Sequence, residues 1–353
     1  MAMFKELNSY AGLFAKVQVM KRDLLKPIDY DNLISRSSVY EIASYLNNNT
    51  GYSSVLNKVN ISDVHRGQLE RLLRKSREES FVKLTNFIGG NDKRFINLYV
   101  MQTETRLIKS ALRRIAEKDF VKVGTDASLH LEGKYSFDAD KLMKADNMRA
   151  FKEAVANAPF YDLIEPFLTE NPDVFKIEML LDGYFFKTQW KAIGKLIGKT
   201  DKVAVERAFG SNIDMINIMW ILRAKKYLNL SDELIIAHII PVHYRLKKDK
   251  IFQMIYSPDG ESAQKVLQDT AYGHITFDSE IPMETIQRET MVRILKSLAR
   301  SHPFSILSVV CYIYMKDIEI SNIIAVVESI RYNVNKDEIK KYLIGIGGDR
   351  SGY

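Results

Sequence analysis

Apolar residues recur at helical spacing along most of the chain. Between Phe4 and Val17 they follow one another at intervals of three and four, which places them on one face of a helix. A first helix of about five turns is therefore predicted, and it must end before Pro27, because proline lacks the amide hydrogen that a helix interior needs.

The same periodicity predicts a series of further helices. A short one follows Ser37-Ser38, where a hydroxyl can cap the first turn, and it ends at the Asn-rich segment before Gly51. The predicted helices after the first cover residues 39–46, 62–88, 94–120, 148–157, 173–197, 211–228, 262–269, 282–300 and 316–332. A polar stretch, residues 121–146, shows no clear period and suggests a loop.

One polar pattern recurs within these helices. An acidic residue, an Asn three residues later and a Tyr ten residues after that occur as Glu319, Asn322 and Tyr332. They occur again, 105 residues earlier, as Asp214, Asn217 and Tyr227. A weaker copy begins at Glu104, 110 residues before the second, with Leu107 in the place of Asn. We call these three segments the motif helices.

A second feature recurs with nearly the same period. Tyr52, Tyr161 and Tyr272 each follow a short predicted helix and lie 109 and 111 residues apart. Two patterns with one period of about 110 residues indicate a triplicated chain, whose unit is too long for the common helical solenoids. We predict an all-α fold of three similar helical subdomains, residues 1–120, 121–230 and 231–353, arranged as a pseudo-threefold funnel with a central cavity.

Composition supports a folded helical protein. The chain has 353 residues, 46% of them hydrophobic, and only 8 are Pro, which suits a packed core and argues against disorder. Cys311 is the only cysteine and lies in an apolar run, so an internal disulfide is excluded and a buried thiol is expected. No signal peptide or membrane-spanning run is visible, and a chain that stays inside the cell is expected.

The charge is mildly basic. The net charge of +7 arises from 51 basic and 44 acidic residues spread along the chain, which could assist docking to acidic surfaces. Five cations between Arg66 and Arg77 share a predicted helix, and such a run is usually a solvated face. A basic helical scaffold, or a nucleic-acid-binding protein with this face on the phosphates, is the alternative function.

No pattern predicts catalysis, a cofactor or a metal. Gly198-Lys199-Thr200 ends like a phosphate-binding loop, but the Gly that must precede this tripeptide by five residues is Ile193 here, and the flanking pattern is helical. The six histidines show no metal-ligand spacing. The carboxylates form no distinctive acid–base pair. We expect no catalytic residues and no cofactor.

Two interpretations of the motif helices remain open. Their acids can stabilise helix ends while the Asn side chains satisfy nearby backbone groups. Alternatively, the polar stripes face the central cavity and bind a partner, in which case charge reversal at Asp214 and Glu319 should weaken partner binding without loss of helicity. The candidate partner-binding residues are Asp214, Asn217, Arg223, Lys225, Glu319, Asn322 and Arg331.

The segment from Ile306 to Ile323, with its Lys316-Asp317-Ile318-Glu319-Ile320-Ser321-Asn322-Ile323 core, resembles the signature of the C subunit of V-type (A-type) ATPases, which is called the d subunit in eukaryotes. Further matches span the chain, including Tyr10 with Lys16-Val17, Ser44-Tyr45-Leu46 with Tyr52, Tyr184-Phe185 and Asp214-x-x-Asn217-Ile218. Two positions depart from the pattern: Ser321 stands where the family usually has Arg, and Leu107 where a strict repeat would have Asn.

This resemblance implies a non-catalytic central rotor subunit of a rotary ion-translocating ATPase or ATP synthase. Such a subunit is an all-helical funnel, is present once per complex, and lies on the cytoplasmic face of the membrane, peripheral to it. Its implied partners are the central-shaft subunits, whose tip enters the cup, and the membrane proteolipid ring, so that torque passes between ATP chemistry and ion translocation. Nucleic acid is not among its implied partners.

Overall fold

The computed structural model describes residues 2–117, 135–277, 281–332 and 334–346. Every regular element in these ranges is a helix, so the prediction of an all-helical fold is confirmed. The α-helices of the first part of the chain are α1 (Ala2–Arg22), α2 (Pro27–Ile34), α3 (Val39–Asn49), α4 (Ser53–Leu56), α5 (Arg66–Thr85), α6 (Gly90–Ile96) and α7 (Leu98–Glu117). Those of the middle are α8 (Ala139–Lys144), α9 (Met148–Val155), α10 (Tyr161–Ile164), α11 (Val174–Leu196) and α12 (Lys199–Arg223). The last part contains α13 (Asp232–His238), α14 (Lys248–Ile255), α15 (Gly260–Gln268), α16 (Met283–Ser301), α17 (Leu307–Arg331) and α18 (Lys336–Tyr342).

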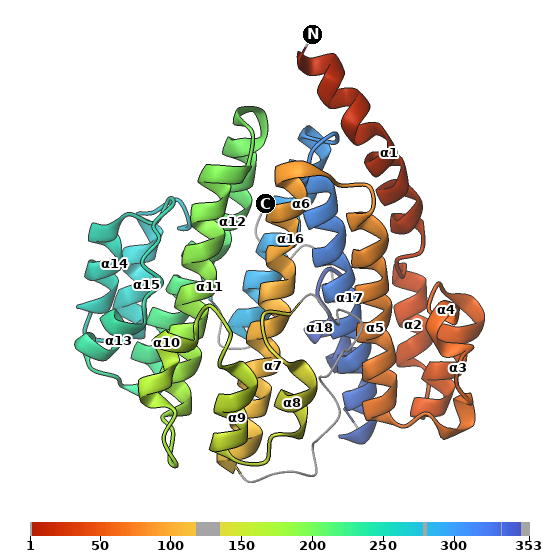
Figure 1. The fold of residues 1–353 in the computed structure, drawn as a ribbon, viewed down its shortest axis with the longest axis horizontal. Coiled ribbons are helices and arrows are strands. Elements are labelled where there is room, and N and C mark those ends of the chain that lie inside the picture. Colours follow the sequence, from red (N-terminus) through yellow and green to blue (C-terminus); the bar gives the residue numbers. More distant parts are fainter. Residues whose placement is uncertain (1, 118–134, 278–280, 333, 347–353) are drawn as a thin grey trace.

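Six long helices form the middle of the molecule. Helix α17 packs between α5 and α16, α12 packs between α16 and α11, and α11 also packs against α7. Phe81 of α5 stacks on Tyr99 of α7, with ring centroids 4.7 Å apart, and thereby joins the two ends of this series. Figure 1 shows the six helices side by side, with α2–α4, α8–α10 and α13–α15 as three groups of short helices outside them.

The apolar core follows this arrangement. A central cluster joins residues from α1, α5, α6, α7, α11, α12, α16 and α17. Each outer group of short helices has its own cluster, built on the lower half of a motif helix as drawn in Figure 1. The outer cluster of α2–α4 contains Ile320 and Val327 of α17, so the beginning and the end of the chain share one core. The division at residues 120/121 and 230/231 and the pseudo-threefold funnel stay predictions.

Many predicted helix limits agree with the structure. Ser38 and Asp173 cap α3 and α11 by accepting hydrogen bonds from the backbone N–H groups of Glu41 and Lys176, as side chains that can accept a hydrogen bond do at helix starts. Helix α5 begins at Arg66, after a 3₁₀ turn at Ile61–Asp63, rather than at Ser62.

The motif helix α12 begins far earlier than predicted. It starts at Lys199 rather than Ser211, because Gly210 continues the helix instead of ending it. A Cβ atom at Gly210 would lie 2.4 Å from Cγ of Tyr244, so the glycine permits close packing here. Similarly, α17 begins at Leu307, ahead of the polar pattern that starts at Lys316. The residues 118–134 of the predicted loop lie outside the described residues, whereas 139–144 form α8.

Candidate functional site

The acid and Asn of each motif helix are buried. Asp214 and Asn217 of α12, and Glu319 and Asn322 of α17, each expose at most 3% of their surface. A buried carboxylate or carboxamide destabilises the fold unless hydrogen bonds replace its lost water. Their contacts therefore decide what these residues do.

Asp214 organises the segment that follows α13. Its carboxylate accepts hydrogen bonds from the backbone N–H groups of Tyr244 (3.1 Å), Arg245 (2.7 Å) and Leu246 (2.9 Å). The Tyr272 hydroxyl donates a fourth at 2.7 Å. Burial, with the nearby Asp214 charge, raises the pKa of Tyr272 far above its usual value, which keeps this hydroxyl a donor.

Glu319 makes the same kind of contact with the beginning of the chain. Its carboxylate accepts a hydrogen bond from the backbone N–H of Leu25 and one of 2.8 Å from the Tyr52 hydroxyl. Lys316, one turn earlier on α17 and also buried, donates at 2.7 Å and lies 3.9 Å from the centre of the Tyr52 ring. Burial followed by the charge of Glu319 raises the pKa of Tyr52.

Each of the two Asn side chains forms two hydrogen bonds with the backbone of a single residue. Asn217 donates to the Ile240 carbonyl at 3.0 Å and accepts from the Ile240 N–H at 2.9 Å. Asn322 donates to the Ile344 carbonyl and accepts from the Ile344 N–H, both at 3.0 Å. A carboxamide that satisfies both groups of one buried residue fixes that stretch of chain against the helix. The structural interpretation of the two Asn residues is confirmed.

The weaker copy of the motif, on α7, keeps the buried acid but has an apolar residue in the place of Asn. Glu104 of α7 is buried and accepts a hydrogen bond from the backbone N–H of Ser136. Burial raises its pKa, although this bond opposes the shift. Leu107, where a strict repeat would have Asn, packs in the outer apolar cluster with Phe137. An apolar contact thus replaces the Asn–backbone pair at this position.

The remaining candidates lie nearer the surface. The guanidinium of Arg223 pairs with Glu284, and the Lys225 ammonium lies 2.6 Å from an Asp232 oxygen. Arg331 is exposed and lies over the ring of Tyr332. Each of the seven candidates therefore contacts another residue of this chain. Partner binding by them stays a prediction.

A cavity of about 540 Å³ lies among the six long helices. One part of its wall is apolar and includes Phe95, Phe209 and Leu295. The polar part of the wall consists of Arg74, Arg77, Tyr99, Gln102, Arg106, Gln189, Asn212, Gln287, Arg288, Tyr314, Asp317 and Ser321. Asp214, Asn217, Glu319 and Asn322 are not among the residues that line it. The motif helices do face the cavity, but with neighbouring residues.

The cavity wall carries more positive than negative charge. Four arginines line it, and Asp317 is the acid among its lining residues. Arg77 pairs with Asp317, and Arg74 donates to Glu70 at 2.7 Å. Arg288 of α16 donates to the Ser321 hydroxyl at 2.9 Å. Ser321 stands where the family signature usually has Arg, so Arg288 brings a guanidinium group to that position from another helix. Sequence reasoning missed Arg106, Arg288 and Asp317 as cavity residues. Only Asp317 carried a local signal, because Ile313, Tyr314, Ile320 and Ile324 lie one and two turns from it on the same helical stripe.

The cations of α5 are only partly solvated, contrary to the sequence-based prediction. Arg77 exposes 4% of its surface and is an internal ion-pair partner. Arg66 pairs with Glu328, and Arg74 with Glu70. The reason is that α5 packs on α17 along most of its length, so part of the basic stripe faces protein. This face therefore offers less positive charge to a nucleic acid than its sequence suggests.

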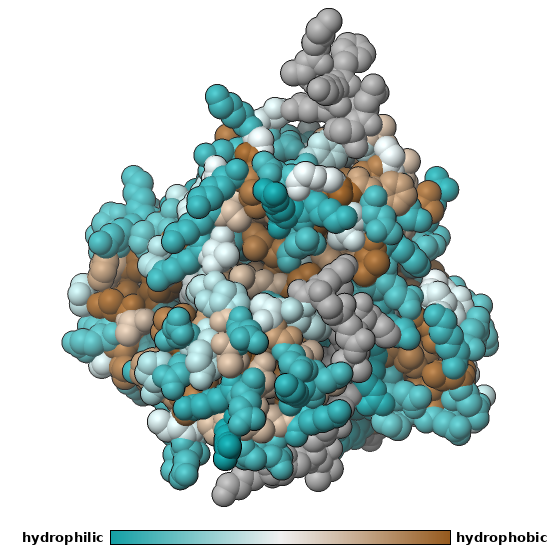
Figure 2. All heavy atoms as spheres, viewed as in Figure 1, coloured by the Kyte–Doolittle hydropathy of each residue, from teal (hydrophilic) through white to brown (hydrophobic). Residues whose placement is uncertain are grey.

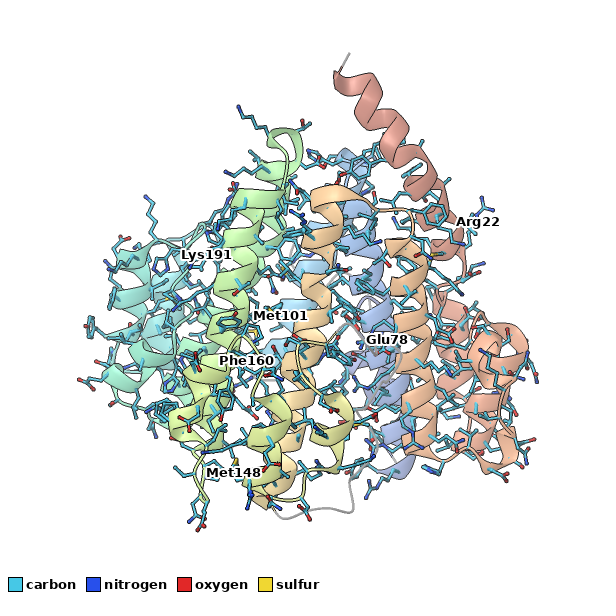
Figure 3. The ribbon with its side chains drawn as sticks, in the orientation of Figure 1. Arg22, Glu78, Met101, Met148, Phe160 and Lys191 are labelled. Carbon is cyan, nitrogen blue, oxygen red and sulfur yellow. The ribbon has the colours of Figure 1, made fainter. Side chains whose placement is uncertain are left out.

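Glu78 is a fully buried acid beside these arginines. In Figure 3 its side chain points from α5 toward the middle of the molecule. Within the described part of the chain neither carboxylate oxygen has a hydrogen-bond partner, and the nearest Arg77 nitrogen is 3.9 Å away. Burial raises the pKa of Glu78 to about 7, although the charges of Arg77, Arg106 and Arg74 lower it.

Replacing Glu78 by Gln should make the protein less sensitive to pH. Because the folded-state pKa lies above the usual value of 4.5, the contribution of protonated Glu78 to stability is fully present below pH 4.5 and is lost as the pH rises from there through 7. The full loss corresponds to roughly 3 kcal/mol. Urea denaturation should show Glu78→Gln more stable than wild type at pH 8 and similar to it at pH 5. Glu79→Gln, on the outer side of α5, is the control, and an equal difference at both pH values would contradict the assignment.

Other candidate chemistry finds no support in the described residues. No group of three or more His, Cys, Asp or Glu side chains there is placed to hold a metal ion. Gly198 lies between α11 and α12, so the Gly-Lys-Thr sequence joins two helices rather than following a strand. Cys311 is buried, as expected, and burial raises the pKa of its thiol. No described helix is both long enough and apolar enough to span a bilayer.

The fold and cavity define an all-helical protein whose long helices surround a partly charged interior space. Comparison with known proteins gives its family. The model of the ATP synthase (C/AC39) subunit family matches residues 13–342, and the chain belongs to that family.

Curated relatives agree over nearly their full length. The C subunit of the A-type ATP synthase of Methanosphaera stadtmanae is 25% identical, with 96% of this chain and 89% of the relative covered. Its counterpart from Methanobrevibacter smithii is 22% identical, with 90% and 83% covered. The counterpart from Archaeoglobus fulgidus is 22% identical, with 95% and 96% covered. The family resemblance stated from the sequence is confirmed.

Proposed function

We propose that this chain is the non-catalytic central rotor subunit of a V-type or A-type rotary ATPase or ATP synthase. In this role it docks the central shaft onto the membrane proteolipid ring and transmits torque between them. The observation that carries the proposal is family membership over residues 13–342 together with a cavity surrounded by the six long helices. The relatives are named as the C subunit of A-type ATP synthases.

Torque transmission requires a body that resists shear. The central apolar cluster connects helices from the beginning, middle and end of the chain, and such close-packed interiors have low compressibility. The Glu319 contacts with Leu25 and Tyr52 tie the last long helix to the first outer group. A load applied at the cavity wall would therefore be shared by the whole molecule.

The proposed location is the cytoplasmic face of the membrane, peripheral to it through the ring, with one copy in each complex. A net charge of +7 favours approach to acidic groups on the shaft or the ring. Salt screens this attraction beyond about 10 Å, so close contacts must provide the specificity. On the face seen in Figure 2, hydrophilic residues cover most of the surface, and hydrophobic ones are visible between α12 and α6 as well as at the left and right edges, over the short helices.

Depletion and reconstitution test this proposal. Membranes that lack this subunit should retain ATP hydrolysis by the released soluble sector but lose ATP-driven ion pumping, and adding the purified chain should restore pumping. The purified chain alone should hydrolyse no ATP. Affinity capture of the tagged chain from native membranes should recover the shaft and ring subunits. Capture without any rotary ATPase subunit, or unimpaired pumping after depletion, would refute the proposed role.

A further inference from the structure

The polar part of the cavity contains two guanidinium groups that have no carboxylate partner in the part of the chain that the structure describes. Among the described residues, Arg106 has one hydrogen bond, of 3.4 Å to the Thr103 hydroxyl. Arg288 donates to the Ser321 hydroxyl, which is uncharged. By contrast, Arg77 and Arg74 have their acids in Asp317 and Glu70. Two positive charges on the cavity wall are therefore not neutralised by an ion pair with any described residue.

Partial burial strengthens the attraction of these two charges for an anionic ligand. Burial lowers the pKa of Arg106, as does the charge of Arg77, although Asp317 raises it. A half-buried cation interacts more strongly with an anion than a solvated one does, because less water screens the pair. Arg106 and Arg288 are half-buried rather than enclosed, so a ligand can reach them. A carboxylate is the natural partner, since it accepts two parallel hydrogen bonds from one guanidinium.

Size and the apolar wall restrict the ligand further. One turn of an α-helix, about 10–12 Å across and about 5.4 Å long, fills roughly the 540 Å³ of the cavity. Phe95, Phe209 and Leu295 would cover apolar side chains of such a turn. A segment with acidic and apolar residues therefore suits both parts of the wall.

We propose that the cavity receives the tip of a shaft helix that carries acidic residues, and that Arg106 and Arg288 bind its carboxylates. This rests on the proposed function, because it assumes that the shaft enters the cavity. The two arginines come from α7 and α16, on opposite sides of the series of long helices. A tip held by both is fixed in rotation as well as in depth, which a rotor coupling needs.

Binding of the purified shaft subunits to the full chain tests the proposal. Arg106→Gln with Arg288→Gln should raise the Kd about tenfold to a hundredfold, the loss expected for hydrogen bonds between charged groups. Raising the salt concentration should weaken the wild type more than this variant. Arg106→Lys with Arg288→Lys, which keeps both charges, should bind between the two. Arg149→Gln, on the exposed outer helix α9, is the control and should bind like wild type.

A second arm identifies the acids. Neutralising Asp and Glu residues at the shaft tip should weaken binding to wild type but change binding to the Arg106→Gln/Arg288→Gln variant little, because paired groups are not additive. Thermal melts of each variant separate lost binding from lost folding. Wild-type affinity of the folded double variant would overturn the acidic-tip proposal and leave the proposed function standing. Failure of the wild-type chain to bind the shaft subunits at all would overturn both.

Discussion

Asp214→Ala is expected to lower the free energy of unfolding by about 3 to 5 kcal/mol. The substitution removes the acceptor of three backbone N–H groups and of the Tyr272 hydroxyl in one step. Each buried donor left without a partner costs about 1–3 kcal/mol, and water that enters the vacated space recovers part of this loss. Charge reversal at Asp214 should be more severe, so we expect loss of folding rather than selective loss of partner binding.

Urea denaturation followed by circular dichroism measures this effect. Asp249→Ala, an exposed acid in the first turn of α14, is the matched control and should change stability by less than about 1 kcal/mol. Limited proteolysis should show cleavage of Asp214→Ala between α13 and α14, where the backbone donors lie. A loss below about 1 kcal/mol for Asp214→Ala would show that these hydrogen bonds contribute little.

Asp317→Leu is expected to lower the free energy of unfolding by about 3 kcal/mol or more, because it leaves the buried Arg77 cation without its carboxylate. Removing one partner of a buried ion pair lowers the free energy of unfolding by about 3–5 kcal/mol. Replacing both partners by apolar residues often lowers it far less. Asp317 is partly exposed, so water moderates the loss. Glu78 also lies near Arg77, and it should then ionise more readily because the charge of Asp317 no longer opposes its own.

A double-mutant cycle isolates the pair. Arg77→Met with Asp317→Leu should be more stable than Asp317→Leu alone, with a coupling energy of about 1 to 3 kcal/mol between the two positions. Chemical denaturation of the four proteins at pH 7 gives the cycle. If the two losses simply add, the ion pair does not stabilise this part of the cavity wall.

Local structure was largely predictable from the sequence. The period of three and four placed most of the long helices, and the caps at Ser38 and Asp173 fixed helix starts. The failures have local causes. Gly210 usually indicates a helix end, but here it accommodates the Tyr244 ring inside α12. Short elements such as α4 and α10 have too few turns for periodicity to reveal them.

The candidate site was only partly predictable. The spacing of acid and Asn identified positions that are buried and hydrogen-bonded. One of the two sequence-based interpretations had Asn217 and Asn322 satisfy backbone groups, as they do. The cavity arginines were not identified, because Arg106 and Arg288 are 182 positions apart in the sequence and each alone resembles an ordinary charged helix residue. A site assembled from seven helices, α6 and the six long ones, has no local signature.

The sequence by itself determined the helical class, the period of about 110 residues and the family, because these depend on local patterns and their repetition. Only the tertiary structure decided which residues complete each motif. Tyr272 binds Asp214 from 58 positions away, whereas Tyr52 binds Glu319 from 267 positions away. Periodicity indicates which face of a helix is buried. The hydrogen-bond partner of a residue on that face depends on which distant part of the chain packs against it. In this chain that packing joins the last long helix to the first outer group.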